Sequence, residues 1–363
     1  MKITLRWLLL FPLLSLGAIG VFCGPVDAQQ SERKDSDFIA RDFKFQSGET
    51  LPELRIHYVT FGTLKRDAAG HATNAVLILH GTMSSSATMI SNFAGELFGA
   101  GQALDAAKYF VIIPDSIGHG PSSKPSDGLR TKFPHYGYND MVEAQHRLVA
   151  EGLGIDHLRL VLGTSMGGMH TWLWSEKYPD MMDGVMPITS QPAQISGHNF
   201  LWRHILTEAI RNDPDWKGGA YEKQPSNWLS IVPLFRMMIS SRARLNEAAA
   251  TTAKSIDLYS RIVDDGRKVY DANNFLYALE SSSDYDPEPG LGKIKARLLA
   301  LNFADDLINA AEFGLVEQAV AKIPNARSVT MPMDNKLFGH LNQFHPEVWK
   351  SHLIELLNSL PGA

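Results

Sequence analysis

The chain has 363 residues, a formal net charge of −5 at pH 7, 44% hydrophobic residues and a single cysteine. Because no basic run or Lys/Arg cluster accompanies this charge, we expect neither nucleic acid nor an anionic membrane as a partner. One cysteine excludes a disulfide framework and a thiolate metal site, and the length suits one large α/β domain with an insertion that acts on a small molecule.

Residues 1–28 have the three-part pattern of a secretory signal. A basic start is followed by an apolar run over 7–22, and small residues at Val26 and Ala28 favour cleavage after Ala28. The apolar run is shorter than the roughly 20 residues that a membrane-spanning helix needs. We therefore expect the segment to be removed, leaving a periplasmic or secreted protein without stable membrane insertion.

Cys23 provides an alternative interpretation of this segment, because a cysteine at the end of such a signal can carry a lipid anchor. The residue before it is the bulky Phe22, where lipid modification calls for a small side chain. A soluble exported protein is therefore favoured over a lipoprotein. If cleavage follows Ala28, the mature chain contains no cysteine.

Short apolar runs after a polar, charged linker over 29–41 predict the strands of a sheet. The run over 53–64 alternates in the manner of a half-buried strand. Other runs are continuously apolar, which is typical of strands covered on both faces of a mostly parallel sheet. These runs are 75–81, 109–115, 158–163, 184–189 and 297–303, with 327–333 as a weaker candidate.

Helical patterns alternate with these strands, so the chain is predicted to have an α/β fold with helices flanking the sheet. The helical candidates are 140–152, 166–177, 310–323 and 346–360. The alternation breaks over 191–290, where the patterns are helical and no convincing strand occurs. We therefore predict a helical lid over 191–290, inserted into a core formed by 29–190 and 291–363.

The stretch "LRLVLGTSMGGMHTWLW" over 158–174 predicts a strand, a tight turn and a helix. The turn is a G-x-S-x-G sequence centred on Ser165, and its glycines let the strand and the helix approach closely. The serine hydroxyl then stands clear of the backbone at a helix start, where free N–H groups favour developing negative charge. Ser165 is the predicted nucleophile.

A serine hydroxyl needs a base, and that base needs an orienting acid. In this arrangement the chain order is serine, acid, histidine. Asp305 and Asp306 both follow the strand over 297–303, but adjacent residues cannot easily face one histidine. We favour Asp305 for its distance past the strand, while Asp306 suits a helix N-terminus.

His340 is the predicted base, because Gly339-His340 lies in a loop between the last strand and the terminal helix. His345, just before Pro346, is expected to shape the start of that helix instead. Other histidines are expected on the surface or in the core, among them His57, His146 and His170.

Two backbone N–H groups should hold the oxyanion, and we predict those of Met166 and Thr82. His80, beside the glycine turn, is expected to organise that loop. The loop over 118–123 has no phosphate-loop lysine or dinucleotide pattern, and H-E-x-x-H and paired cysteines are absent from the sequence. No metal or cofactor is therefore predicted.

The stretch over 138–188 resembles the homoserine O-acetyltransferases of the α/β-hydrolase superfamily, which carry D-M-V-x-x-Q, then G-x-S-M-G-G-M-Q and Y-P-D. Similar lid motifs occur at "AIRNDPDWKGGAY" (209–221) and "YDANNFLYALESSSDYD" (270–286). The resemblance covers about 54–344 and implies Ser165 as nucleophile, Asp305 as acid and His340 as base.

The sequence departs from that family at the histidine. The family's G-H-D-x-F-L motif, whose carboxylate helps hold the amino acid substrate, is Gly339-His340-Leu341 here. The asparagine-rich stretch around the family's G-P-S-S loop is also altered, to "SIGHGPSSKP" (116–125). Export would separate the enzyme from acetyl-CoA, the donor in the family, leaving water as the acceptor.

The sequence thus predicts an exported serine hydrolase that cleaves a small-molecule carboxylic ester through an acyl-enzyme. One alternative is an O-acyltransferase that uses the same triad. A second alternative is a catalytically inactive binding protein on this fold. An oligomer is compatible with the sequence.

Overall fold

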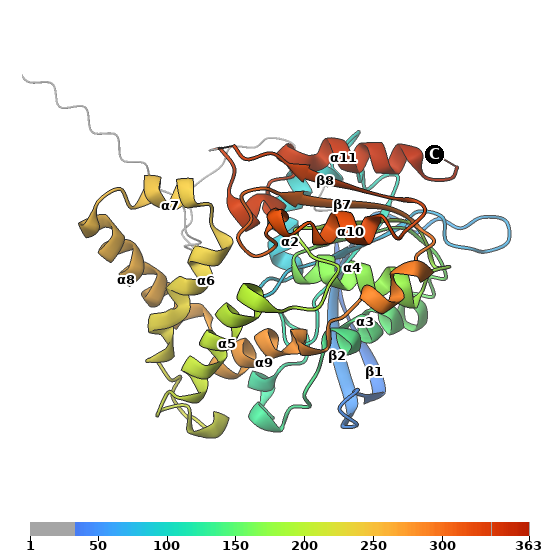
Figure 1. Cartoon of the computed structure of the whole chain (residues 1–363). Helices are drawn as coiled ribbons and strands as arrows, with labels where there is room; N and C mark the ends of the chain where they lie inside the picture. Colours follow the sequence, from blue (N-terminus) through green and yellow to red (C-terminus); the bar gives the residue numbers. More distant parts are fainter. Residues whose placement is uncertain (1–32, 335, 363) are drawn as a thin grey trace, which may run out of the picture.

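The computed structural model describes residues 33–334 and 336–362, so the expected signal segment and Cys23 lie outside the described residues. The described strands form one eight-stranded sheet in the order β1-β2-β4-β3-β5-β6-β7-β8 (Figure 1). β2 is antiparallel to β1 and β4, and the other neighbours are parallel. The predicted α/β fold with a mostly parallel sheet is therefore confirmed. The strands are β1 (Lys34–Lys44), β2 (Thr50–Phe61), β3 (Ala75–Leu79), β4 (Phe110–Pro114), β5 (Leu158–Thr164), β6 (Met182–Ile188), β7 (Arg297–Phe303) and β8 (Ala326–Met331).

The first strand corrects the sequence prediction, which placed a linker over 29–41. β1 pairs with β2 along its length, from Lys34 opposite Thr60 to Lys44 opposite Thr50. It is an edge strand with many charged side chains, and Asp42 has a φ of 49° that interrupts the alternation of buried and exposed positions. Because the strand is highly charged and its apolar residues do not alternate regularly with polar ones, the sequence pattern did not indicate a strand.

Helices cover both faces of the sheet, which explains why the central strands are apolar throughout (Figure 1). Trp172 and Trp174 of α4 belong to the core on one face, and Phe93 of α2 and Trp349 of α11 to the core on the other. The core helices are α2 (Ser86–Phe93), α3 (Tyr138–Arg147), α4 (Met166–Lys177), α10 (Leu315–Val320) and α11 (Pro346–Ser359). Short π-helical segments continue α2 and α3, namely η1 (Ala94–Phe98) and η4 (Leu148–Gly152).

One predicted helix is shorter than expected. The pattern over 310–323 suggested a continuous helix, but the chain forms the 3-10 turn η9 (Ala311–Phe313) and then α10. Gly314 separates them with a φ of 60°, a left-handed conformation that ends the first turn.

Between β6 and β7 the described residues form only helices and loops, in the region where the lid was predicted. Trp202 and Phe235 stack at 5.5 Å and, with Trp228, belong to a third core inside this lid. Its α-helices are α5 (Gly197–Arg211), α6 (Val232–Ile239), α7 (Arg242–Ala248), α8 (Thr252–Val269) and α9 (Ala272–Glu280). Its 3-10 segments are η5 (Lys217–Gly219), η6 (Trp228–Ile231), η7 (Ser281–Asp284) and η8 (Glu288–Lys293).

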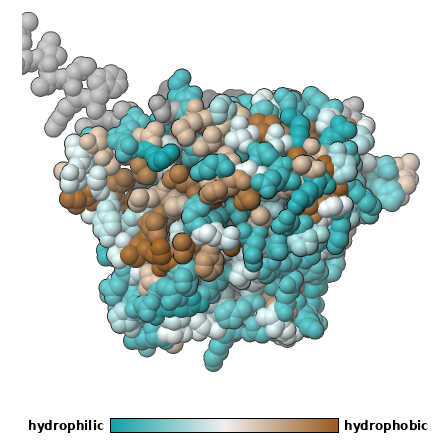
Figure 2. Space-filling view, in the orientation of Figure 1, coloured by the Kyte–Doolittle hydropathy of each residue, from teal (hydrophilic) through white to brown (hydrophobic). Residues whose placement is uncertain are grey.

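Hydrophobic surface gathers on the lid side of the molecule, whereas the lower part of the same face is mostly hydrophilic (Figure 2). On α5, the large hydrophobic residues Phe200, Leu201 and Ile205 are exposed. Among the described residues, no helix combines the length and the apolar character needed to cross a membrane.

Candidate active site

Ser165 lies in the turn between β5 and α4, with a φ of 55° and a ψ of −117°. This conformation is strained for a residue with a side chain, and the close packing around it explains the glycines. A Cβ atom at Gly163 would lie 2.0 Å from the carbonyl oxygen of Gly167, and one at Gly167 would lie 2.1 Å from that of Leu79. The G-x-S-x-G spacing therefore holds the serine in a fixed, strained turn.

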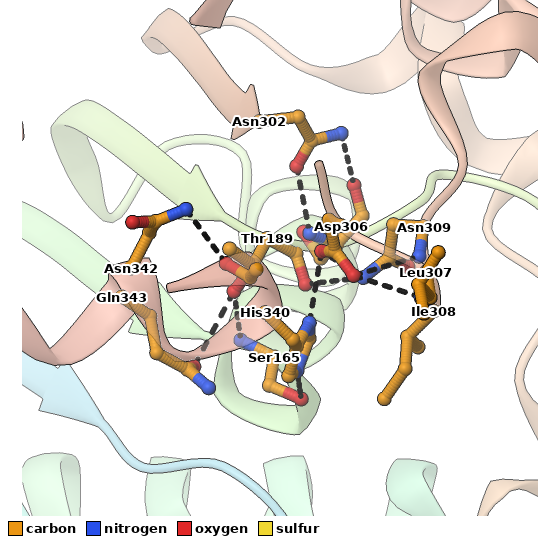
Figure 3. Close-up of polar contacts among 12 residues, drawn as sticks. Ser165, Thr189, Asn302, Asp306, Leu307, Ile308, Asn309, His340, Asn342 and Gln343 are labelled. Atoms are coloured by element: carbon orange, nitrogen blue, oxygen red, sulfur yellow. Dashed lines mark hydrogen bonds and ion pairs between the residues drawn. The ribbon is translucent and has the colours of Figure 1, made fainter. Parts of the chain in front are cut away.

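His340 meets this serine from the other end of the chain. It lies on the 3-10 segment η10 (Gly339–Phe344), and its Nε2 is 2.7 Å from Ser165 Oγ (Figure 3). Gly339, with a φ of 68°, permits a close approach to the lid, because a Cβ atom there would lie 2.6 Å from the backbone nitrogen of Ser241. The structure thus brings the two predicted side chains into hydrogen-bonding contact.

The acid beside the histidine is Asp306, and the expectation that Asp305 faces the histidine is wrong. His340 Nδ1 is 2.8 Å from Asp306 Oδ2 (Figure 3). An ionised carboxylate can only accept hydrogen bonds, so Nδ1 carries the proton and Nε2 is free to accept from the serine hydroxyl. The three side chains form one continuous path.

Asp305 faces a different part of the same loop. Its carboxylate accepts from Gly339 N at 2.7 Å and from Asn342 Nδ2 at 3.0 Å. The reason is a turn after β7, in which Asp306 N donates to Phe303 O at 3.1 Å and directs the second carboxylate into the site. Asp305 therefore ties down the segment that carries the histidine.

The two adjacent aspartates have opposite electrostatic environments. Burial alone would raise the pKa of Asp306, but the charge and hydrogen bond of His340, with donors from Ile308 and Asn309, lower it below its usual value. For Asp305, burial prevails over its own donors and raises the pKa. The surroundings of the carboxylate beside the histidine therefore favour its ionised form more than those of Asp305 do.

The loop after β3 lies against the serine. A Cβ atom at Gly81 would be 3.1 Å from Ser165 Cβ. No described hydrogen bond uses the backbone N–H of Thr82 or of Met166. Neither predicted oxyanion donor therefore has a described acceptor. Met166 begins α4 directly after Ser165, and Thr82 follows Gly81 in the loop beside it.

His80 holds this loop in place. Its Nδ1 donates to Gly81 O at 2.8 Å, and its Nε2 accepts from Ser116 N at 2.9 Å. Burial lowers the pKa of His80 to about 4, against the smaller effect of the Gly81 carbonyl. The imidazole is thus neutral and joins the loops after β3 and β4, as a loop organiser would.

A family model described as the alpha/beta hydrolase fold matches residues 74–278. Homoserine O-acetyltransferase from Haemophilus influenzae is 30% identical over 292 residues, covering 71% of this chain and 80% of that protein. Ethyl acetate hydrolase from Pseudomonas veronii is 30% identical over 340 residues, covering 86% of this chain and 93% of that protein. The chain belongs to the α/β-hydrolase family. Within that family it is a divergent relative of the homoserine O-acetyltransferases, and it is an enzyme of the class that includes acyltransferases and esterases.

Solved structures agree with the assignment of this chain to the α/β-hydrolase family. The acetyl esterase MekB superposes with a TM-score of 0.77 and 26% identity, over 90% of this chain and 97% of that one. The overall fold is therefore shared with this esterase along most of both chains.

A polar layer behind the triad was not predicted from the sequence. Thr189 Oγ1 lies 3.3 Å from Ser165 N, Asn309 Nδ2 donates to Thr189 O at 2.7 Å, and Asn302 bonds to the backbone of Ser190 (Figure 3). These residues follow or end the parallel strands β6 and β7. Polar side chains at the carboxyl ends of parallel strands were the signal that could have revealed them.

The remaining histidines do not contact the serine. His345 stacks on Phe338 at 3.8 Å at the start of α11, in keeping with a role in shaping that turn. His57 of β2 pairs with Asp37 of the edge strand β1, and His146 stacks on Tyr178.

Proposed function

We propose that this α/β-hydrolase is an exported serine esterase that cleaves carboxylic esters through an acyl-enzyme. The observation that carries the proposal is the continuous hydrogen-bonded path from Ser165 through His340 to Asp306, with contacts of 2.7 and 2.8 Å. A serine, an imidazole and a buried ionised carboxylate in this order make a hydroxyl nucleophilic.

In the first half of the reaction, Ser165 Oγ bonds to the ester carbonyl carbon while His340 Nε2 takes its proton. The C–O bond to the alcohol then breaks, and the same nitrogen returns the proton to the leaving alkoxide. Asp306 stabilises the imidazolium that exists between these steps. It also fixes the tautomer, because its carboxylate accepts the Nδ1 proton.

We assign to the N–H groups of Met166 and Thr82 the stabilisation of the negative charge that develops on the carbonyl oxygen. Their lack of other acceptors supports this role, as does the contact of the Gly81-Thr82 loop with the serine. In the second half, water attacks the acyl-enzyme with His340 as base, releasing the carboxylic acid and free Ser165.

Two observations favour water over an alcohol as the acceptor. The histidine is followed by Leu341, where the resembling acyltransferases have a carboxylate that helps hold an amino acid. The match to ethyl acetate hydrolase also spans more of the chain, 86% against 71% for the Haemophilus acyltransferase at equal identity.

Export is part of the proposal and rests on the signal pattern over 1–28. Mass spectrometry of the protein recovered from the periplasm or medium tests it. We expect a mature N-terminus at Gln29, and a full-length chain retained in the cytoplasm would refute export without affecting the chemistry.

An ester series tests the chemistry directly. We expect release of p-nitrophenol from p-nitrophenyl esters of graded acyl length, with a fluorophosphonate probe labelling Ser165. Absence of both turnover and labelling in folded protein would contradict the proposal and favour an inactive binding protein.

The second candidate is an O-acyltransferase, which the 30% identity to homoserine O-acetyltransferase supports. Incubation with acetyl-CoA and homoserine, followed by thiol release, separates the two. We expect ester hydrolysis without acceptor-dependent thiol release, and the reverse pattern would favour the acyltransferase.

A further inference from the structure

Three neighbouring side chains at the base of the lid each bury one polar atom that has no hydrogen-bond partner. They are Arg203 on α5, Tyr138 at the start of α3 and Thr82 in the loop after β3. Arg203 Nη1, the Tyr138 hydroxyl and Thr82 Oγ1 each lack a partner within hydrogen-bonding distance among the described residues. Buried donors that remain unpaired are rare in folded proteins, so this cluster calls for an explanation.

The three groups face one another. Burial raises the pKa of Tyr138, while the charge of Arg203 and the side chain of Thr82 act on the same hydroxyl in the opposite direction. The ring of Tyr138 also packs edge-on against His170 of α4, with ring centres 4.8 Å apart. The lid helix, the loop after β3 and the helix that follows the nucleophile therefore converge on one polar site.

This site adjoins the nucleophile. Thr82 directly follows Gly81, whose Cβ position would lie 3.1 Å from Ser165 Cβ. A ligand group held by the Thr82 side chain would consequently sit within a few bonds of an ester carbonyl that Ser165 attacks. The cluster is placed to contact part of a substrate.

Arg203 carries a charge that no described carboxylate offsets. It is 5% exposed, and its Nε donates to Asn199 Oδ1 at 3.2 Å. Its guanidinium lies 4.6 Å over the ring of Trp202, and burial lowers its pKa with only Tyr138 acting against this. Arg211 on the same helix is instead paired with Glu280. A buried, unpaired cation is costly, and an anion at this site would offset that cost.

A cavity of about 510 Å³ opens beside Arg203, between α5, α9 and the start of α3. Its wall carries three carboxylates, namely Glu280, which is paired with Arg211, and two that are committed to backbone donors. Asp140 accepts from Gly137 N at 2.9 Å, and Asp284 accepts from Tyr138 N at 2.8 Å. The cavity therefore provides room for a ligand while its own acids leave the guanidinium free.

We propose that Arg203, Tyr138 and Thr82 form a subsite for a carboxylate on the substrate, so that the enzyme prefers esters bearing a negative charge. This rests on the proposed esterase function and specifies its substrate class. A guanidinium and two hydroxyls can all donate to one carboxylate, and charge-assisted bonds of this kind are the strong ones. The charge can belong to the acyl group or to the alcohol.

Two matched substrate pairs distinguish these sources. For the acyl side, p-nitrophenyl hemisuccinate is compared with p-nitrophenyl butyrate. For the alcohol side, O-acetylglycolate is compared with ethyl acetate by titration of released acid. We expect kcat/KM to be higher for the charged member of one pair, and equal values within both pairs would overturn the proposal.

Arg203→Met tests the residue, with Arg203→Lys as the conservative variant and Arg211→Met as the matched control. We expect Arg203→Met to lower kcat/KM for the charged ester about 10- to 100-fold, the size expected for lost bonds to a charged group, mainly through KM. The neutral ester should be little affected, Arg203→Lys should recover part of the preference, and Arg211→Met should keep it.

A merely structural role for Arg203 predicts a different result. If it only supports the Thr82 loop, Arg203→Met will lower kcat equally for charged and neutral esters, and the proposal fails. If the variant does not fold, inhibition of the wild-type enzyme decides. Succinate should compete with a neutral ester while succinamide should not, and equal inhibition by both would refute the subsite. Fluorophosphonate labelling of Ser165 reports separately on the proposed function.

Discussion

The catalytic path of Ser165, His340 and Asp306 and the cluster around Arg203 are both buried, but they differ in how fully their polar atoms are hydrogen-bonded. In the path, both oxygens of Asp306 accept hydrogen bonds and His340 is bonded through both nitrogens. In the cluster, Arg203 retains an unpaired guanidinium nitrogen. A group that must act the same way on every substrate is held by the protein itself. A group that recognises a substrate is left for that substrate to complete.

The largest expected effect comes from removing the nucleophile of the fully hydrogen-bonded catalytic path. Ser165→Ala should lower kcat about 10⁶-fold on p-nitrophenyl acetate, since the remaining triad members have no hydroxyl to activate. Fluorophosphonate labelling should disappear while the thermal unfolding temperature stays close to that of the wild type. A variant that keeps a tenth of the activity would rule the mechanism out.

The next test separates the two aspartates. Asp306→Asn should lower kcat about 10⁴-fold, because an amide no longer fixes the imidazole tautomer or stabilises its charge. Steady-state kinetics with a neutral ester measures this. Full activity in this variant, with loss in the Asp305 variant instead, would return the acid role to Asp305.

Acid should lower the stability of the fold through three buried histidines, two of which contact each other and one of which contacts Tyr138. Burial lowers the pKa of His80 to about 4 and that of His119 to about 3, and it lowers that of His170 well below 6.5. Below pH 6.5 these histidines bind protons in the unfolded chain but not in the folded chain. The free energy of unfolding therefore decreases as the pH falls from 6.5 towards 4. Each histidine contributes about 1.4 kcal/mol per pH unit in that window.

Urea unfolding at pH 7.5 and pH 5 measures this dependence. His119→Asn should flatten it by removing one of the buried neutral imidazoles, whose Nε2 has no described partner. A stability that rises on acidification, or an unchanged slope in the variant, would contradict the account.

The smallest effect on activity is expected at Asp305. Asp305→Ala removes the acceptor for Gly339 N and Asn342 Nδ2, so we expect a loss of about 1–3 kcal/mol in unfolding free energy. The activity of the folded fraction should change far less than in Asp306→Asn. A catalytic loss as large as that of Asp306→Asn would show that tying down the loop is as important as orienting the ring.

Some of this site was predictable from the sequence because local geometry dictates it. A strand, a G-x-S-x-G turn and a helix fix Ser165 within one short stretch, and the glycine spacing follows from carbonyl oxygens that leave no room for a Cβ atom. His340 was predictable from its place after the last strand. Both conclusions depend on few residues that are close in the chain.

The rest depends on directions and on distant partners. Which of two adjacent aspartates enters the site is decided by one turn, closed by Asp306 N and Phe303 O. The convergence of Arg203, Tyr138 and Thr82 joins a lid helix, a core helix and a loop, and no spacing in the sequence encodes it. β1 was missed because its charges face solvent and Asp42 breaks its alternation.

The nucleophile and its base stand 175 residues apart, with the whole helical insertion between them. A growing polypeptide therefore displays its serine long before the imidazole has been synthesised, and the hydroxyl stays inert in the meantime. If the proposed mechanism holds, the chain can attack an ester only once the C-terminal segment has brought His340 to Ser165. On this mechanism, the order of synthesis would itself delay reactivity until the chain is complete.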